Sequence, residues 1–258
     1  GSEMCIRDRL GYKTRKDFFI FVFLYLIISA AVIIFWIYFS VIALILFILM
    51  SIVHFGLCDW SYLGLKKYKW SVSLTHGLNI VFGIIFFHTN ETFEIFTFLS
   101  NLSFNQFQEY LYIVYICYFF LLIRYAYLAI KFTKLRWGIL EMSIILLVIF
   151  LTEPLVAFSI YFCFIHTFKH VKSILKDTSK YLSNNKFITI TTVSFTILTW
   201  VGGSLAIIYL HKSFSFDESF IKTLFIGLAA LTLPHMTLVD IFYSCLLYTS
   251  PSPRDLRL

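Results

Sequence analysis

Residues 18–57 of the chain read FFIFVFLYLIISAAVIIFWIYFSVIALILFILMSIVHFGL, forty positions without a charged side chain. A helix that crosses the hydrocarbon core of a bilayer needs about 20 apolar residues. The stretch is therefore too long for one span and fits two, joined by a tight turn near residues 38–40. A fold built from membrane-spanning helices is the direct expectation.

The rest of the chain continues the same pattern. Only 14% of its 258 residues are charged and 60% are hydrophobic, whereas about a quarter of the residues of a soluble domain are charged. This composition excludes a soluble domain and a disordered chain, and the sustained helical runs argue against a β-barrel. We predict an all-α, polytopic transmembrane helix bundle of about eight spans, with a break between two of them at Thr152-Glu153-Pro154. Beyond the first two spans, the apolar runs are 72–87, 110–130, 138–151, 154–171, 188–210 and 220–243.

The basic residues between these runs predict the orientation of the bundle. Fourteen lysines and arginines fall on one side of the expected topology, and the longest loop on the other side carries Glu91, Glu94 and Glu109. Basic loops stay in the cytoplasm, so we expect a multi-pass protein of the cell inner membrane with these loops cytoplasmic. The net charge of +7 then follows from topology and requires no nucleic-acid partner. The basic residues are Lys13, Arg15, Lys16, Lys66, Lys67, Lys69, Lys131, Lys134, Arg136, Lys169, Lys172, Lys176, Lys180 and Lys186.

Both ends of the chain differ in character from the rest, and they resemble translated sequencing-adapter DNA. The DNA word agatgtgtataagagacag encodes Met4 to Asp8, and its reverse complement encodes Cys245 to Ser250. We therefore expect residues 1–9 and 245–258 to be artefacts and residues 10–244 to form a single transmembrane helical domain. The three cysteines of that domain have no CxxC spacing, so no disulfide framework is expected.

Three histidines are candidate metal ligands. His166 and His170 are separated by about one helical turn, so both rings leave the same face of a helix and can share an ion. His54 is expected at a similar depth, and Asp59 can accept the second ring proton of a liganding histidine and fix its tautomer. Neutral nitrogen ligands suit Zn, Cu, Fe or Ni. The same spacing also occurs in histidines that are only solvated near the membrane interface.

Further polar residues lie inside the expected spans. Pro234 is expected to open a kink that His235 lines, with Asp240 one to two turns further on, although a structural hydrogen bond from His235 explains the pattern equally well. His76 is a weaker candidate for function. His88 and His211 are expected at the opposite membrane interface, half exposed to water and without a functional role.

As a set, these motifs resemble those of the Brp/Blh family of bacterial and archaeal membrane β-carotene 15,15'-dioxygenases. The residues that carry the resemblance are His54-Phe-Gly-x-x-Asp59, Tyr161-Phe-Cys-Phe-Ile-His-x-x-x-His170 and Phe225-Ile-Gly-Leu-Ala-Ala-Leu-Thr-x-Pro-His-Met236 with Asp240. The resemblance implies an Fe(2+) enzyme that uses O2 to split the central double bond of β-carotene into two molecules of all-trans-retinal. That product would supply the chromophore of a retinal-binding microbial rhodopsin.

The resemblance also assigns site residues. It implies that His54, His166 and His170 are the metal ligands and the catalytic residues. It implies supporting or substrate-pocket roles for His76 and His235, with Asp59 and Asp240 beside them. A fourth family ligand belongs to a Pro-His-Gly-x-x-Asp motif on a helix ahead of the first span, where this chain has its adapter-like residues, and we expect that helix to be missing. His235 remains an alternative fourth ligand.

Two other interpretations stay open at this stage. One is a different histidine-ligated membrane oxidase acting on a lipid or a carotenoid, although a single HxxxH supplies too few ligands for two irons. The other is a non-enzymatic membrane protein that binds carotenoid or retinal and uses its histidines for structure or proton passage.

Overall fold

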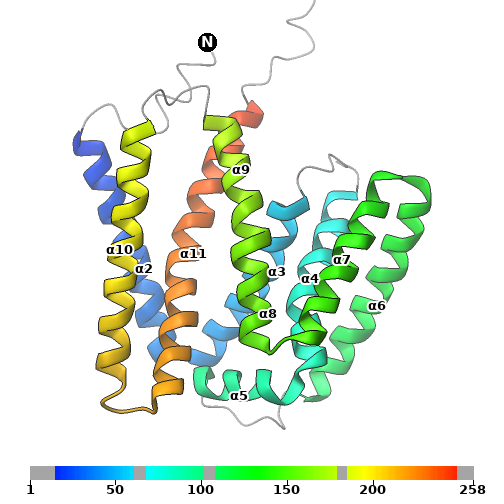
Figure 1. Cartoon of the computed structure of the whole chain (residues 1–258), viewed down its shortest axis with the longest axis horizontal. Coiled ribbons are helices and arrows are strands. Elements are labelled where there is room, and N and C mark those ends of the chain that lie inside the picture. Colours follow the sequence, from blue (N-terminus) through cyan, green and yellow to red (C-terminus); the bar gives the residue numbers. More distant parts are fainter. Residues whose placement is uncertain (1–14, 61–67, 101–107, 179–184, 249–258) are drawn as a thin grey trace, which may run out of the picture. The chain divides into compact units, whose positions relative to one another are not determined.

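The computed structural model describes residues 15–60, 68–100, 108–178 and 185–248, and Figure 1 shows these ranges as helices. Every regular element within them is helical, which confirms the predicted all-α fold. In chain order the elements are α2 (Arg15–Tyr38), α3 (Ser40–Trp60), α4 (Lys69–Phe87), α5 (Thr89–Ser100), α6 (Gln108–Lys131), α7 (Lys134–Leu151), α8 (Pro154–Ile160), the π-helical segment η4 (Tyr161–His166), α9 (Thr167–Thr178), α10 (Asn185–Leu210) and α11 (Phe216–Tyr248). Residues 1–9 and 249–258 of the adapter-like ends lie outside the described ranges.

Most of the long helices have the length and the apolar composition of membrane spans. Among the described residues, six helices are long and apolar enough to cross a membrane. The predicted number of about eight spans is thus approximate: α2 adds a shorter apolar segment, Val22–Tyr38, and α7 covers the predicted span 138–151. The six segments are Ser40–Asp59, Lys69–Phe87, Leu111–Lys131, Pro154–Lys172, Val193–Leu210 and Phe216–Thr237.

The helix breaks follow from local sequence. The helix that starts at residue 15 ends at Tyr38, and a new one begins at Ser40, within the turn predicted near residues 38–40. α7 ends at Leu151 because Thr152 and Glu153 are extended, with ψ of 153° and 155°. Pro154 is the first residue of α8, the helical position where its missing N–H costs no hydrogen bond. Both breaks agree with the sequence prediction.

The region predicted as the longest loop contains a helix instead. α5 occupies residues 89–100, and it runs across the end of α4 rather than alongside the long helices (Figure 1). Only one face of α5 is apolar, with Phe93, Ile95 and Leu99 buried. With 12 residues and several polar side chains, α5 is too short and too polar to be a membrane span, so the search for spans predicted a loop there.

The described residues divide into two compact units, one formed by residues 15–40 with 222–248 and the other lying within 41–221. In the first unit, the Tyr25 hydroxyl on α2 donates a hydrogen bond to the Leu231 carbonyl on α11, at 2.8 Å. In the second unit, α4 packs against α5, α6, α7 and α8. Asn79 joins three of these helices, because its Oδ1 accepts from the Tyr118 hydroxyl at 2.7 Å and its Nδ2 donates to the Met142 carbonyl at 3.4 Å.

A close crossing of α3 and α4 depends on two glycines. A Cβ atom on Gly56 would overlap the backbone carbonyl of Ser73, and one on Gly77 would overlap the carbonyl of Ile52. Each glycine therefore lets the backbone of the other helix approach directly. His54 and Asp59 on α3 and His76 on α4 flank this crossing.

Candidate metal centre

Three imidazole rings converge in the second unit. His54 projects from α3, His166 is the last residue of η4, and His170 lies one turn later on α9. The ring centroids are 5.0 Å apart for His54 and His166, 5.9 Å for His166 and His170, and 6.5 Å for His54 and His170. Helix α3 and the continuous segment of η4 and α9, far apart in sequence, thus bring together three imidazole rings.

The spacing of the rings can be compared with that of a metal site. Bonds of about 2.1 Å from imidazole nitrogens to one ion place the ring centroids roughly 4.5–5.5 Å apart. The His54–His166 pair has this spacing already. The other two pairs are wider, and as the side chains stand no group of three or more His, Cys, Asp or Glu residues in the described ranges is placed to hold a metal. His170 takes part in both of the wider pairs, and its side chain is half-buried.

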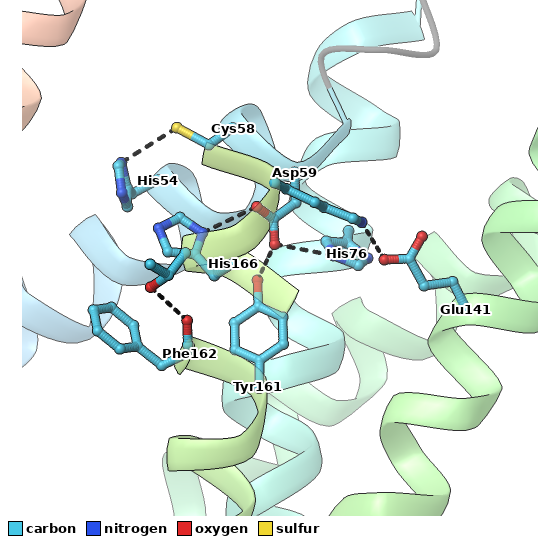
Figure 2. A network of polar contacts seen from close by, with 10 residues as sticks. His54, Cys58, Asp59, His76, Glu141, Tyr161, Phe162 and His166 are labelled. Atoms are coloured by element: carbon cyan, nitrogen blue, oxygen red, sulfur yellow. Dashed lines mark hydrogen bonds and ion pairs between the residues drawn. The ribbon is translucent and has the colours of Figure 1, made fainter. Parts of the chain in front are cut away.

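The Nδ1 atoms of two of these rings already contact side chains of α3. Nδ1 of His166 lies 3.0 Å from Oδ1 of Asp59, and Nδ1 of His54 lies 3.6 Å from the sulfur of Cys58 (Figure 2). A carboxylate only accepts hydrogen bonds, so Nδ1 of neutral His166 carries the proton and Nε2 carries the lone pair. An Nδ1–H of His54 that donates to the Cys58 sulfur leaves its Nε2 in the same state. The donor set therefore fits a cation that accepts imidazole Nε2 ligands.

Asp59 is the centre of this polar cluster and is fully buried. Its Oδ2 accepts a short hydrogen bond from the Tyr161 hydroxyl and lies 3.9 Å from Nε2 of His76 (Figure 2). Burial of a carboxylate is costly unless its oxygens are hydrogen-bonded. The hydrogen bonds to Tyr161 and His166, both on η4, meet this requirement, one at each oxygen.

Aromatic rings enclose the imidazoles. Phe55 meets the edge of His166 with centroids 4.9 Å apart, and Phe162 stacks on His166 at 5.7 Å. His54 and His166 are only 6% and 4% exposed. A cluster of Phe55, Ile80, Ile145, Ile149, Ala157 and Tyr161 packs beside them. The surroundings are thus apolar and exclude water from the side of the rings that they cover.

Comparison with known proteins gives the same family as the motifs. The family model described as Beta-carotene 15,15'-dioxygenase matches residues 1–243. The chain belongs to this family. A curated relative, the Beta-carotene 15,15'-dioxygenase of uncultured marine bacterium 66A03, is 28% identical over 220 residues, which is 85% of this chain and 79% of the relative. No solved structure matches significantly.

The remaining residues predicted for a family site fall into two groups. His76 lies with the imidazole cluster, fully buried on α4 and facing Asp59. His235 belongs to the first unit and is half-buried on α11. The Asp240 side chain lies outside the described residues. His235 and Asp240 therefore stay as predictions.

Sequence reasoning missed two contributors, Tyr161 and Cys58. Both stand within the motifs that pointed to the family, yet neither residue type suggested a role beside a histidine site. A third finding concerns His88, expected at the interface without a role. It is half-buried, and its Nε2 lies 2.7 Å from the Ile149 carbonyl, so it links the end of α4 to α7.

Proposed function

We propose that the protein is an iron-dependent dioxygenase that cleaves the central 15,15' double bond of β-carotene with O2 to give two molecules of all-trans-retinal. One observation carries the proposal beyond family membership, namely the convergence of His54, His166 and His170 with the Nδ1 of His166 held by a carboxylate. The two oxygen atoms of O2 balance the reaction, since each half of the cleaved polyene ends as one aldehyde.

The proposed metal ligands are the Nε2 atoms of these three histidines. When bound, Fe(2+) would supply a redox-active centre with coordination positions left open for O2. Asp59 would keep His166 in the tautomer that can bind the ion, and Cys58 would do the same for His54.

The apolar surroundings support a carotenoid substrate. Phe55 and Phe162 flank the His166 ring, so a long polyene that reached the imidazoles would meet aromatic carbon rather than water. β-Carotene partitions into the bilayer, and the outward faces of α6 and α10 are apolar, with Phe120 and Leu198 65% and 63% exposed. We therefore place the substrate's entry laterally, from the lipid.

The cellular setting completes the proposal. The protein would lie in the cell inner membrane with its basic loops in the cytoplasm. The retinal it releases would serve as the chromophore of a retinal-binding rhodopsin in the same membrane. O2 and the lipid bilayer are the other partners that this assignment requires.

The test is retinal formation in oxygenated, iron-replete bacterial cells that accumulate β-carotene. We expect retinal from the chain or from the chain extended by a Pro-His-Gly-x-x-Asp helix, and none when His166 is replaced by alanine. Folded protein that leaves β-carotene unchanged in both forms would contradict the proposal. Tight binding of unchanged carotenoid would then favour the non-enzymatic interpretation.

A further inference from the structure

One helix sends two side chains to the same carboxylate. Tyr161, the first residue of η4, donates to Oδ2 of Asp59, and His166, the last residue of η4, contacts Oδ1 through Nδ1. Figure 2 shows the tyrosine and the imidazole reaching Asp59 from successive turns of that helix. Each carboxylate oxygen thus has its own partner from η4.

The π-helical conformation makes this double contact possible. Residues five apart on an α-helix point about 140° away from each other, because each residue turns by about 100°. In a π-turn each residue rotates by a smaller angle than in an α-helix, and the hydrogen bonds join residues five apart. The Thr167 N–H donates to the Phe162 carbonyl in this way. Side chains five apart then return to nearly the same face, which places Tyr161 and His166 together over Asp59.

The tyrosine controls how the carboxylate is turned. A carboxylate on a short side chain can rotate about its last bond and present its oxygens in many directions. The Tyr161 hydroxyl fixes Oδ2, so Oδ1 stays directed at Nδ1 of His166. Tyr161 is 2% exposed and also packs edge-on against Phe55 at 5.2 Å, so its own position is determined by packing.

We infer that Tyr161 is a positioning residue, which acts through Asp59 to hold His166 as the Nδ1–H tautomer with Nε2 available to a metal. The inference rests on the metal centre of the proposed function. It assigns to Tyr161 a share of the metal affinity, although its hydroxyl contacts no imidazole directly. Outer partners of this kind typically account for about 10- to 100-fold in metal affinity.

The test compares two tyrosine hydroxyls that each donate one hydrogen bond to a polar side chain. Tyr161→Phe removes the bond to Asp59, and Tyr118→Phe removes the 2.7 Å bond to Asn79. Fe(2+) affinity of the full chain, purified without oxygen in detergent, is measured by competition with a coloured chelator, and bound Co(2+) is followed by its visible absorption. We expect Tyr161→Phe to weaken Fe(2+) binding about 10-fold or more and to change the Co(2+) spectrum. Tyr118→Phe should change neither.

A double variant separates action through Asp59 from any other route. Asp59→Asn offers His166 an amide and should weaken Fe(2+) binding further, and adding Tyr161→Phe to it should have no additional effect. A Tyr161→Phe affinity equal to that of Tyr118→Phe, or a full extra loss in the Asp59→Asn background, would overturn the inference. Failure of Asp59→Asn to fold leaves the comparison of the two tyrosines decisive. An unsubstituted chain that binds no Fe(2+) would overturn the metal centre itself, a result distinct from a failure of Tyr161 alone.

Discussion

For single residues, what matters at the candidate centre is which nitrogen of each imidazole is already engaged. Nδ1 of His166 contacts Asp59, and Nδ1 of His54 contacts Cys58. Both rings are therefore oriented by residues that are adjacent on α3. An orientation imposed by the protein spares the metal the cost of ordering its ligands. The imidazoles would bind the metal directly, whereas Asp59 acts only through His166. Loss of an imidazole should therefore weaken metal binding more than loss of the carboxylate.

Replacement of His166 or of His170 by alanine is expected to lower Fe(2+) affinity more than about 100-fold, since a ligand matters more than its supporting partner. Retinal formation should be lost in the same variants, while membrane insertion stays intact. The matched control is His211→Ala, because His211 is exposed and contacts Phe216 with ring centroids 6.1 Å apart. Chelator competition on the three purified variants makes the comparison. Unchanged affinity in both His166→Ala and His170→Ala would remove the pair from the metal centre.

The π-helical segment η4 joins α8 to α9 and sets the direction in which Tyr161 and His166 point. Deleting Phe164, which is 76% exposed, should convert η4 to α-helix, and Tyr161 and the histidine would then be four apart on one α-helical face. We expect that variant to keep its Fe(2+) affinity within about threefold. Deleting Phe168, 67% exposed, instead shortens the His166–His170 spacing and turns the second ring by about 100°. That variant should lose the metal, and equal affinities in the two deletions would contradict the role given to the π-turn.

The crossing of α3 and α4 leads to a prediction about stability. Gly56→Ala places a Cβ against the Ser73 carbonyl, and backbone cannot move aside as a side chain can, so we expect a loss of about 1–3 kcal/mol. Gly202→Ala is the control, because a Cβ there meets nothing within 4 Å and alanine favours helix by about 1 kcal/mol. Thermal unfolding in detergent measures both variants. A Gly56→Ala protein as stable as Gly202→Ala would contradict the close crossing.

Across the whole molecule, sequence patterns predicted the helices better than their local geometry. Uncharged length and a single proline were enough for the helix boundaries at residues 38–40 and at Pro154. The convergence of His54 with His166 and His170 was also expected, since all three were placed at one depth. The π-turn and the tyrosine bond were not expected, because a single π-turn is too short to leave a periodic pattern in the sequence. Helix α5 was missed because only one of its faces is apolar.

The orientation of the whole molecule in the membrane yields the last prediction. α7 has 18 residues and is about 27 Å long, so Thr133 and Glu153, exposed just beyond its two ends, should lie on opposite sides of the bilayer. Thr133 lies between the basic residues Lys131 and Lys134, which predicts that its side is cytoplasmic. In intact cells, a membrane-impermeant maleimide should therefore label Glu153→Cys and not Thr133→Cys. The parent chain gives the background labelling of its own cysteines, and both variants should be labelled after the cells are lysed. Labelling of Thr133→Cys alone would reverse the orientation, and labelling of both in intact cells would show that α7 does not cross the membrane.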